Sequence, residues 1–276
     1  MKLRINPWFT DGCTLFLNNI FKWYPGVLKT KLTVLEFGGG NSTLFFLQKK
    51  AKVVTIESDD VFIADIKNVA LQLGYKVHVA DKLFSEFELI ETNDLIIIKS
   101  VDIKEIKFDI FTALDWTFIV NDGISRKDIV SKIQSSNLTN SIIIIDNIEY
   151  CANWGHLDRS SAKPDLVSIY RKILRDTNWT NYIFEQPEGR DSHAAADTTG
   201  WEAPHRWASA VLWNKEHLLN KFIISNLGFP IVNINGIDDS DINTLGERCP
   251  YDWKKMQWLK EPFSTELDLK LVRKFD

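Results

Sequence analysis

The sequence has little that would mark a secreted or membrane-spanning protein. Its three cysteines, Cys13, Cys151 and Cys249, lie far apart and form no C-x-x-C pair, which excludes a disulfide framework and a cysteine-based zinc site. No stretch has the apolar length that crosses a bilayer, and residues 1–10 contain no apolar signal-peptide core. We therefore expect a cytoplasmic protein with free thiols and no membrane span.

Basic charge is also in short supply. The chain has 33 Lys and Arg against 37 Asp and Glu, a net charge of -4, and no basic block. Proteins that bind nucleic-acid phosphates are normally basic, so we expect no nucleic-acid partner. Apolar residues make up 45% of the chain and charged residues 25%. These values are close to the averages for globular proteins, which disfavours disorder, collagen and coiled coil.

What the sequence does contain is an alternation of short apolar runs with longer stretches of helical period, the pattern of βαβ units around a parallel sheet. Ile142 to Ile145, apolar at each position, is typical of a strand covered on both faces. The predicted fold class is α/β, with a Rossmann-like, doubly wound, mostly parallel sheet of seven strands, an antiparallel last strand and helices on both faces. The expected strands are 32–37, 52–57, 76–80, 116–121, 141–146, 182–186 and 207–213, and the expected helices 14–23, 42–50, 61–73, 127–134 and 164–175.

Two segments depart from this simple alternation. Residues 94–98 are either a further short strand or a buried turn. Residues 187–206 form a long polar excursion in which glycines and alanines separate charged and aromatic residues, a composition typical of a lid over a polar ligand. We expect one main domain over residues 1–215, including the N-terminal helix, with a C-terminal extension over residues 216–276 packed on it.

A glycine-rich turn, in Val34-Leu-Glu-Phe-Gly-Gly-Gly-Asn-Ser-Thr43, joins a strand to a helix. At such a turn the backbone can approach a ligand closely and helix N–H groups can face it. Glu36 lies two residues before Gly38, and Glu57 ends the next strand, where a carboxylate can accept hydrogen bonds from ribose hydroxyls. A dinucleotide fingerprint needs Gly or Ala where this chain has Thr43, so Thr43 counts against a nicotinamide site.

At these residues the chain resembles the class I S-adenosylmethionine-dependent methyltransferases, whose first motif is an acidic residue followed by Gly-x-Gly at the end of the first strand. The resemblance runs in order from about residue 32 to residue 213 and implies a methyltransferase-like domain. It implies that Glu36, Gly38 and Gly40 hold the methionine portion, that Glu57 binds the ribose and that Asp81 lies by the adenine. The full set of cofactor-binding residues predicted in this way is Glu36, Gly38, Gly39, Gly40, Ser42, Thr43, Glu57, Ser58, Asp81 and Asp122.

Oxygen-bearing side chains follow two later strands. Asp122 follows one apolar run, and Asp146 and Asn147 follow the next. The carboxyl ends of parallel strands meet at one edge of a sheet, and two carboxylates with an amide oxygen suit Mg²⁺. The set is similar to that of catechol O-methyltransferase and its bacterial relatives, in which Asp, then Asp-Asn, coordinate Mg²⁺. We therefore predict Asp122, Asp146 and Asn147 as metal ligands.

The chain departs from that family at one catalytic position. The family has a Lys three residues after the first Asp, where this chain has Ser125. This leaves the general base open among Asp122, His156, His193 and His205, with Arg126 or Lys127 as an electrostatic helper. The acceptor and the oligomeric state are left open as well.

The function expected from these patterns is that of an O-methyltransferase. It would move the sulfonium methyl of S-adenosylmethionine to a hydroxyl of a small molecule or sugar. Whether a divalent metal assists the reaction is left open. Two alternatives stay open. One is a nicotinamide-dependent oxidoreductase or epimerase on the same kind of sheet, and the other is a methyltransferase fold that has lost catalysis and serves as a binding module.

Overall fold

The computed structural model describes Pro7, Phe9 and residues 11–23, 31–81, 89–106, 109–123, 126–146, 176, 178–186 and 207–221. The chain divides into two compact units. The first unit comprises Met1–Trp8 and Leu28–Asp146, and the second Phe9–Val27 and Asn147–Asp276. The predicted division at residues 215 and 216 stays a prediction. Within the described residues, no helix combines the length and the apolar character that a membrane span requires.

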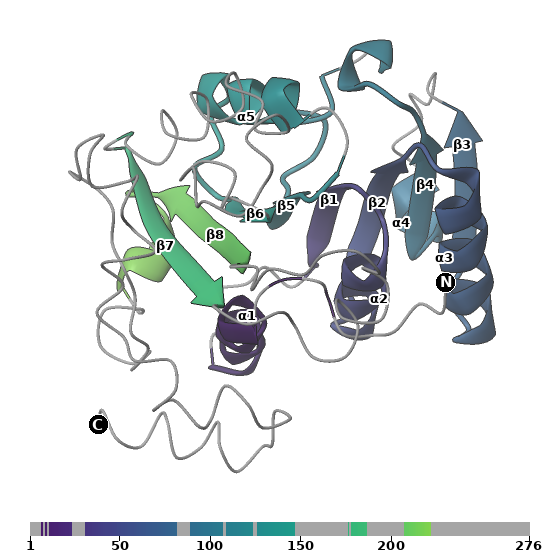
Figure 1. Ribbon diagram of the computed structural model, residues 1–276, viewed down its shortest axis with the longest axis horizontal. Helices are drawn as coiled ribbons and strands as arrows, with labels where there is room; N and C mark the ends of the chain where they lie inside the picture. Colours follow the sequence, from purple (N-terminus) through teal and green to yellow (C-terminus); the bar gives the residue numbers. More distant parts are fainter. Residues whose placement is uncertain are drawn as a thin grey trace, which may run out of the picture. The chain divides into compact units, whose positions relative to one another are not determined.

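The first unit is built around parallel strands (Figure 1) in the order β3-β4-β2-β1-β5-β6. Nearly all residues of the four middle strands are buried, so these strands are covered on both faces. The strands are β1 (Thr33–Phe37), β2 (Lys52–Glu57), β3 (Val77–Asp81), β4 (Leu95–Lys99), β5 (Phe118–Asn121) and β6 (Ile142–Asp146).

Helices connect these strands. Asp59 starts α3 because its carboxylate accepts hydrogen bonds from the backbone N–H groups of Val61 and Phe62, at 2.7 and 3.2 Å, which is ordinary N-capping. The helices of this unit are α2 (Asn41–Gln48), α3 (Asp60–Gln72), α4 (Leu89–Thr92) and α5 (Arg126–Ser135), with a 3₁₀ helix η1 (Ile103–Glu105).

β1 lies at the point where the strand order reverses. It pairs in parallel with β2 on one side and with β5 on the other. Right-handed crossovers that lead away from β1 in opposite directions place α2 and α5 on opposite faces of the sheet. In an open parallel sheet, ligands bind beyond the carboxyl ends of the strands at such a switch point. The glycine turn after β1 is therefore where a ligand is expected.

β4 settles the segment that the sequence left undecided. Leu95 to Ile98 are fully buried, and β4 pairs in parallel with β2 on one side and β3 on the other. Four apolar residues between polar neighbours are too few to separate a strand from a buried turn by periodicity. The described residues thus form eight strands instead of the seven expected, and the predicted α/β class with a mostly parallel sheet is confirmed.

The second unit contains α1 (Asp11–Trp23), β7 (Trp179–Gln186), β8 (Trp207–Asn214) and the 3₁₀ helix η3 (Leu218–Lys221). β7 and β8 form the predicted antiparallel pair. Phe16 of α1 packs on this pair, with ring centroids 5.2 Å from Phe184 and 6.0 Å from Trp213. The predicted helix over 164–175 and the excursion over 187–206 lie outside the described residues.

Candidate cofactor site

The glycine turn between β1 and α2 uses all three of its backbone N–H groups within the protein. Gly38 N–H donates to the carbonyl of Ile56 at 2.9 Å. Gly39 N–H donates to Glu57 Oε2 at 2.9 Å, and Gly40 N–H donates to Thr43 Oγ1 at 3.0 Å. A buried N–H without an acceptor is costly, so the turn is well satisfied. None of these three donors is left to bind an anionic ligand.

Gly38 is required by a backbone contact. Its φ is +88°, and a Cβ there would lie 2.6 Å from Gly123 Cα and 2.8 Å from the carbonyl of Asp122. The contact is reciprocal, because a Cβ on Gly123 would lie 2.4 Å from Gly38 Cα. The turn after β1 thus packs directly on the turn after β5. The sequence suggested close approach of a cofactor as the reason for this glycine, whereas the structure gives the neighbouring turn as the reason.

Gly40 is in the opposite situation. Among the described residues, no atom lies within 4 Å of the position that a Cβ would take, and its φ of 171° is accessible to any residue. Gly39 is intermediate, since a Cβ there would meet Ile66 and Thr55 at 2.8 Å. Gly40 therefore borders the open space of the turn, where a ligand can approach the backbone.

Glu36 is fully buried beneath this turn. Its Oε2 accepts a hydrogen bond from the hydroxyl of Thr43, which is itself the acceptor for Gly40 N–H. Within the described part of the chain, neither Glu36 Oε1 nor Thr55 Oγ1 has a hydrogen bond of ordinary geometry. Burial raises the pKa of Glu36 to about 7, against the opposing effect of the hydroxyls of Ser42, Thr43 and Thr55. Glu36 thus supports the turn from below.

Glu57, at the end of β2, lies beside the same turn. Its side chain is 8% exposed, and it accepts backbone hydrogen bonds from Gly39 at 2.9 Å, Ser58 at 2.6 Å and Asp59 at 2.9 Å. A carboxylate has about four acceptor positions. Within the described residues, the position beyond these three bonds faces only the Ser58 hydroxyl, at 3.5 Å, a long contact that another hydroxyl can replace. The carboxylate therefore ties the glycine turn to the start of α3 and retains room for a ligand hydroxyl.

Asp81 ends a strand that is not adjacent to the strand of Glu57. The order β3-β4-β2 puts β4 between their strands, and the residue in register with both is Lys99. The residues that follow Lys99, and not Asp81, are therefore next to Glu57 at this edge. Ser100 N–H donates to the carbonyl of Glu57 at 3.0 Å, and Val101 is 62% exposed.

The two carboxylates predicted to bind a metal follow neighbouring strands. β5 and β6 are parallel, and their last registered pair is Asn121 with Ile145, so Asp122 and Asp146 occupy the next pair of positions. Asp122 is half-buried and Asp146 is 2% exposed. Their type and adjacency fit a hard cation. Among the described residues no group of three or more His, Cys, Asp or Glu that could hold a metal is present, and Asn147 lies outside these residues.

The remaining catalytic candidates are only partly described. Arg126 is the first residue of α5, and the placement of its side chain is not described. His193 and His205 lie outside the described residues. Sequence reasoning missed Thr55, whose position in register with Glu36 leaves no trace in the sequence. It also missed the packing role of Gly123, for which a glycine directly after a strand end was an available signal.

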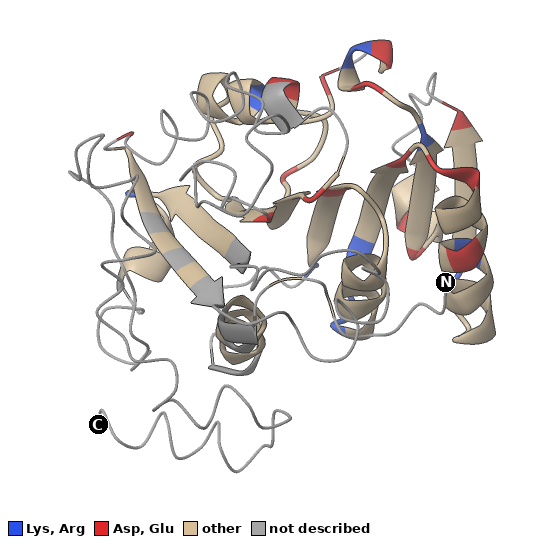
Figure 2. Cartoon of the chain, in the orientation of Figure 1, with Lys and Arg blue, Asp and Glu red and all other residues tan. Residues whose placement is uncertain are grey.

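Acidic residues predominate along the carboxyl ends of the strands of the first unit (Figure 2). One Lys at this edge, Lys99, is paired with Asp60 at 2.5 Å. An edge of this kind attracts a cation and repels an anion. The acidic residues at or just after the strand ends are Glu57, Asp81, Asp102, Asp122 and Asp146.

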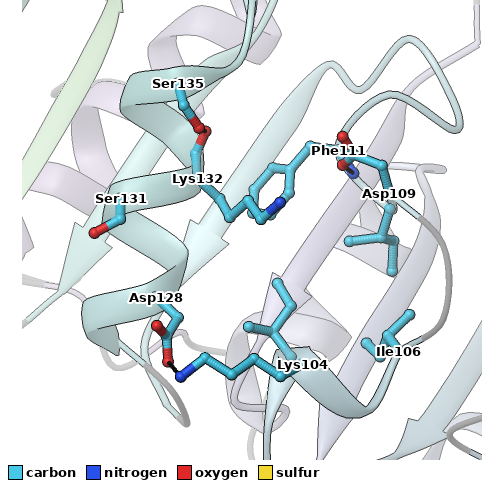
Figure 3. A pocket seen from close by; sticks show the side chains of 10 residues that line it. Lys104, Ile106, Asp109, Phe111, Asp128, Ser131, Lys132 and Ser135 are labelled. Carbon is cyan, nitrogen blue, oxygen red and sulfur yellow. Dashed lines mark hydrogen bonds and ion pairs between the residues drawn. The ribbon is translucent and has the colours of Figure 1, made fainter.

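A separate cavity of about 400 Å³ lies between η1 and α5. Its lining is mixed, with apolar side chains such as Phe111 and Ile106 next to Lys132 and to an ion pair of Lys104 with Asp128 at 3.1 Å (Figure 3). None of the residues of the glycine turn, nor Glu36 or Glu57, lines it. The cavity is therefore distinct from the predicted cofactor site.

Comparison with protein-family models and with curated proteins finds no match. Among solved structures, the O-methyltransferase TomG from Streptomyces achromogenes, involved in tomaymycin synthesis and in complex with SAM, is 15% identical, with a TM-score of 0.44 over 74% of this chain and 79% of that one. An O-methyltransferase from Bacillus cereus in complex with SAH is 15% identical, with a TM-score of 0.40 over 73% and 79%.

An SAH-bound methyltransferase from Podospora anserina is 12% identical, with a TM-score of 0.41 over 74% of this chain and 78% of that one. These proteins are methyltransferases, the kind of enzyme that the sequence resembles. Because the identities are low and the TM-scores are below 0.5, none of these likenesses carries a functional assignment. The assignment rests on the geometry of the site.

Proposed function

We propose that the protein is an S-adenosylmethionine-dependent O-methyltransferase that acts on a hydroxyl of a small molecule. The observation that carries this proposal is the glycine turn. Each of its N–H groups donates to the protein, two of them to the Glu57 carboxylate and to the Thr43 hydroxyl that Glu36 holds. A dinucleotide site uses such N–H groups to bind a pyrophosphate. Here the N–H groups already donate to protein acceptors, and carboxylates lie beside the turn, so the site favours a cationic ligand over an anionic one.

S-adenosylmethionine is such a cation, since it carries a sulfonium and an ammonium group. In this proposal its methionine portion lies on the open side of Gly40, and a ribose hydroxyl donates to Glu57 in place of the long Ser58 hydroxyl contact. The adenine then lies toward the exposed side chain of Val101, beyond the end of β4, which is the strand next to Glu57. The same acidic edge disfavours the nicotinamide alternative, because a pyrophosphate would face carboxylates.

The proposed reaction is an in-line displacement. The acceptor oxygen forms a bond to the methyl carbon while the carbon–sulfur bond breaks, the sulfur keeps the electron pair, and the hydroxyl proton passes to a base. Holding the two reacting atoms in line is the main contribution that a protein makes to such a step. For a reaction without a bound metal, Asp122, at the switch point of the sheet, is the base candidate within the described residues. His156, His193 and His205 are candidates outside them.

A divalent cation such as Mg²⁺ is part of the proposal as an assistant. Asp122 and Asp146 would hold it together with Asn147, and a bound cation lowers the pKa of a hydroxyl that it binds. Titration of the wild-type protein and of an Asp146→Asn variant with Mn²⁺, followed by electron paramagnetic resonance, tests this part separately. Equal Mn²⁺ affinity in both proteins would remove Asp146 from the ligand set.

Thermal unfolding in the presence of S-adenosylmethionine, S-adenosylhomocysteine or NAD tests the proposed cofactor. A ligand at about 100 times its Kd stabilises a protein by roughly 2.7 kcal/mol, so we expect the first two to raise Tm and NAD to leave it unchanged. A shift with NAD alone would contradict the proposal. Methyl transfer to a panel of hydroxylated acceptors then separates an enzyme from a binding module with the same fold.

Gly40→Val tests the proposed position of the cofactor at the glycine turn. Since no atom of the described part of the chain lies within 4 Å of a Cβ at this position, the variant is expected to fold with nearly unchanged stability, while its side chain occupies the space proposed for the cofactor. We expect at least a tenfold loss of S-adenosylhomocysteine affinity by calorimetry. Unchanged affinity in a folded Gly40→Val variant would place the cofactor elsewhere.

A further inference from the structure

Glu36 is a buried acid for which the proposed chemistry has no direct use. It is 0% exposed, as is Thr43, so Glu36 reaches the turn only through other groups. The Thr43 hydroxyl has one proton and accepts from Gly40 N–H at 3.0 Å. Its proton is donated to Glu36 Oε2. The three groups form a relay from the carboxylate through the hydroxyl to the amide, which we call the Glu36–Thr43–Gly40 relay.

The strength of this relay depends on the charge of Glu36. An ionised carboxylate only accepts, so Thr43 must donate to it and turns its lone pairs to Gly40 N–H. Such a charge-assisted bond is stronger than a neutral one, and chains of hydrogen bonds strengthen one another. A protonated carboxyl gains a donor, and Thr55 Oγ1, which has no hydrogen-bond partner of ordinary geometry within the described residues, is an acceptor for it in the adjacent strand.

We propose that Glu36 is a positioning residue that acts through Thr43 to set how firmly the amide of Gly40 is held, and so shapes the surface on which the cofactor lies. The inference that this surface receives a cofactor rests on the function proposed above, whereas the relay itself does not. Glu36 titrates close to neutral pH. Among the described groups packed around it, Glu57 is the other ionisable one that influences it, and the remainder are the hydroxyls of Ser42, Thr43 and Thr55.

Amide NMR of the full chain tests the relay without any ligand. Between pH 5.5 and 8.5 we expect the Gly40 amide resonance of the wild type to titrate with a midpoint near 7, the pKa that burial gives Glu36. Glu36→Gln keeps the shape and an acceptor oxygen but cannot ionise, so the titration should vanish. The Gly39 amide, which is held by Glu57, serves as the internal control and should move much less.

Thr43 variants test the middle of the relay. Thr43→Val removes the hydroxyl at nearly constant volume. We expect about tenfold faster hydrogen exchange of the Gly40 amide, the size of effect expected when one hydrogen bond is lost. Thr43→Ser restores the hydroxyl and should restore both protection and titration. A Gly40 amide that titrates as before in Glu36→Gln, or keeps its protection in Thr43→Val, would overturn the relay.

Calorimetry with S-adenosylhomocysteine connects the relay to function. We expect Thr43→Val to bind S-adenosylhomocysteine about tenfold more weakly than the wild type, again the effect of losing one hydrogen bond. Thr43→Ser should bind within about twofold of the wild type. Equal binding by all three proteins, with the NMR results as expected, would contradict the role in cofactor placement. If the wild type itself does not bind, the proposed function fails, while the NMR measurements still decide the relay.

Discussion

The two turns that meet at the switch point of the sheet differ in how their polar groups are satisfied. The turn after β1 is saturated, because each of its amides donates to a partner that the structure identifies. At the end of β5, Asn121 is 0% exposed, and neither atom of its side-chain amide has a hydrogen-bond partner within the described residues. The backbone amides of the first turn are therefore all bonded, although Glu36 Oε1 beneath the turn has no hydrogen-bond partner of ordinary geometry within the described residues. The second retains a polar group that its surroundings do not use.

The turn after β1 is thus preorganised by its own hydrogen bonds, whereas the side-chain amide at the end of β5 is open to a further hydrogen-bonding group. A saturated turn keeps its shape in the absence of ligand, which suits a cofactor that binds repeatedly. A buried amide without partners lowers stability and is retained most readily where another group completes it. Substitutions in and around the two turns test this difference through their effects on the free energy of unfolding and on cofactor affinity.

The largest effect is expected where the turns touch. Gly38→Ala places a methyl group 2.6 Å from Gly123 Cα at a φ of +88°, which combines the cost of a left-handed residue with overpacking against rigid backbone. We expect a loss of about 4 kcal/mol in the free energy of unfolding, measured by urea denaturation with circular dichroism.

Gly40→Ala is the control for this substitution, because its methyl group meets no atom within 4 Å among the residues that the structure describes. We expect it to change the free energy of unfolding by less than about 0.5 kcal/mol. Equal stability of the two variants would mean that the turns do not pack as described.

The second prediction concerns pH. The pKa of Glu36 is raised from 4.5 to about 7 by burial, so between these values the folded protein binds a proton that the unfolded chain has lost. The contribution of Glu36 to stability is therefore present at low pH and falls as pH rises from about 4.5 to 7. Glu36→Gln avoids this loss, and its amide N–H has Thr55 Oγ1 as an acceptor.

At pH 8 we expect Glu36→Gln to be more stable than the wild type by about 3 kcal/mol, the free-energy equivalent of the shift. At pH 4.5 the two proteins should differ little. Urea unfolding at several pH values measures the difference, and a gap that stays constant with pH would contradict the raised pKa.

The sequence predicts those features of the site that depend on neighbouring residues in the chain. It does not predict those that depend on contacts between residues far apart in the chain. The strands and the glycine turn were predicted because apolar runs and glycines are local signals. The packing reason for Gly38 was not predicted, because Gly123, 85 positions later in the chain, supplies the contact. β4 was undecided for a related reason, since its four apolar residues become a strand only when β2 and β3 pair with them.

The third prediction concerns Glu57. Replacement by Ala removes the acceptor for the N–H groups of Gly39, Ser58 and Asp59 and for the proposed ribose hydroxyl. We expect S-adenosylhomocysteine affinity to fall by about 2 kcal/mol, measured by calorimetry. Asp60→Asn, which alters an exposed carboxylate paired with Lys99, is the control and should bind normally. Unchanged affinity in Glu57→Ala would refute the ribose contact.

The smallest effect is expected at Asn121, and its sign carries the argument. Asn121→Leu keeps the approximate shape and removes two polar atoms that have no hydrogen-bond partner within the described residues. We expect the free energy of unfolding to rise by about 1 kcal/mol, because the cost of burying unpaired polar atoms is removed. Asn121→Ala, which leaves a cavity, should instead lower it. If Asn121→Leu were destabilising by a similar amount, the amide would be bonded in solution, for example to an internal water molecule. The turn after β5 would then be as saturated as the turn after β1, and the contrast between them would disappear.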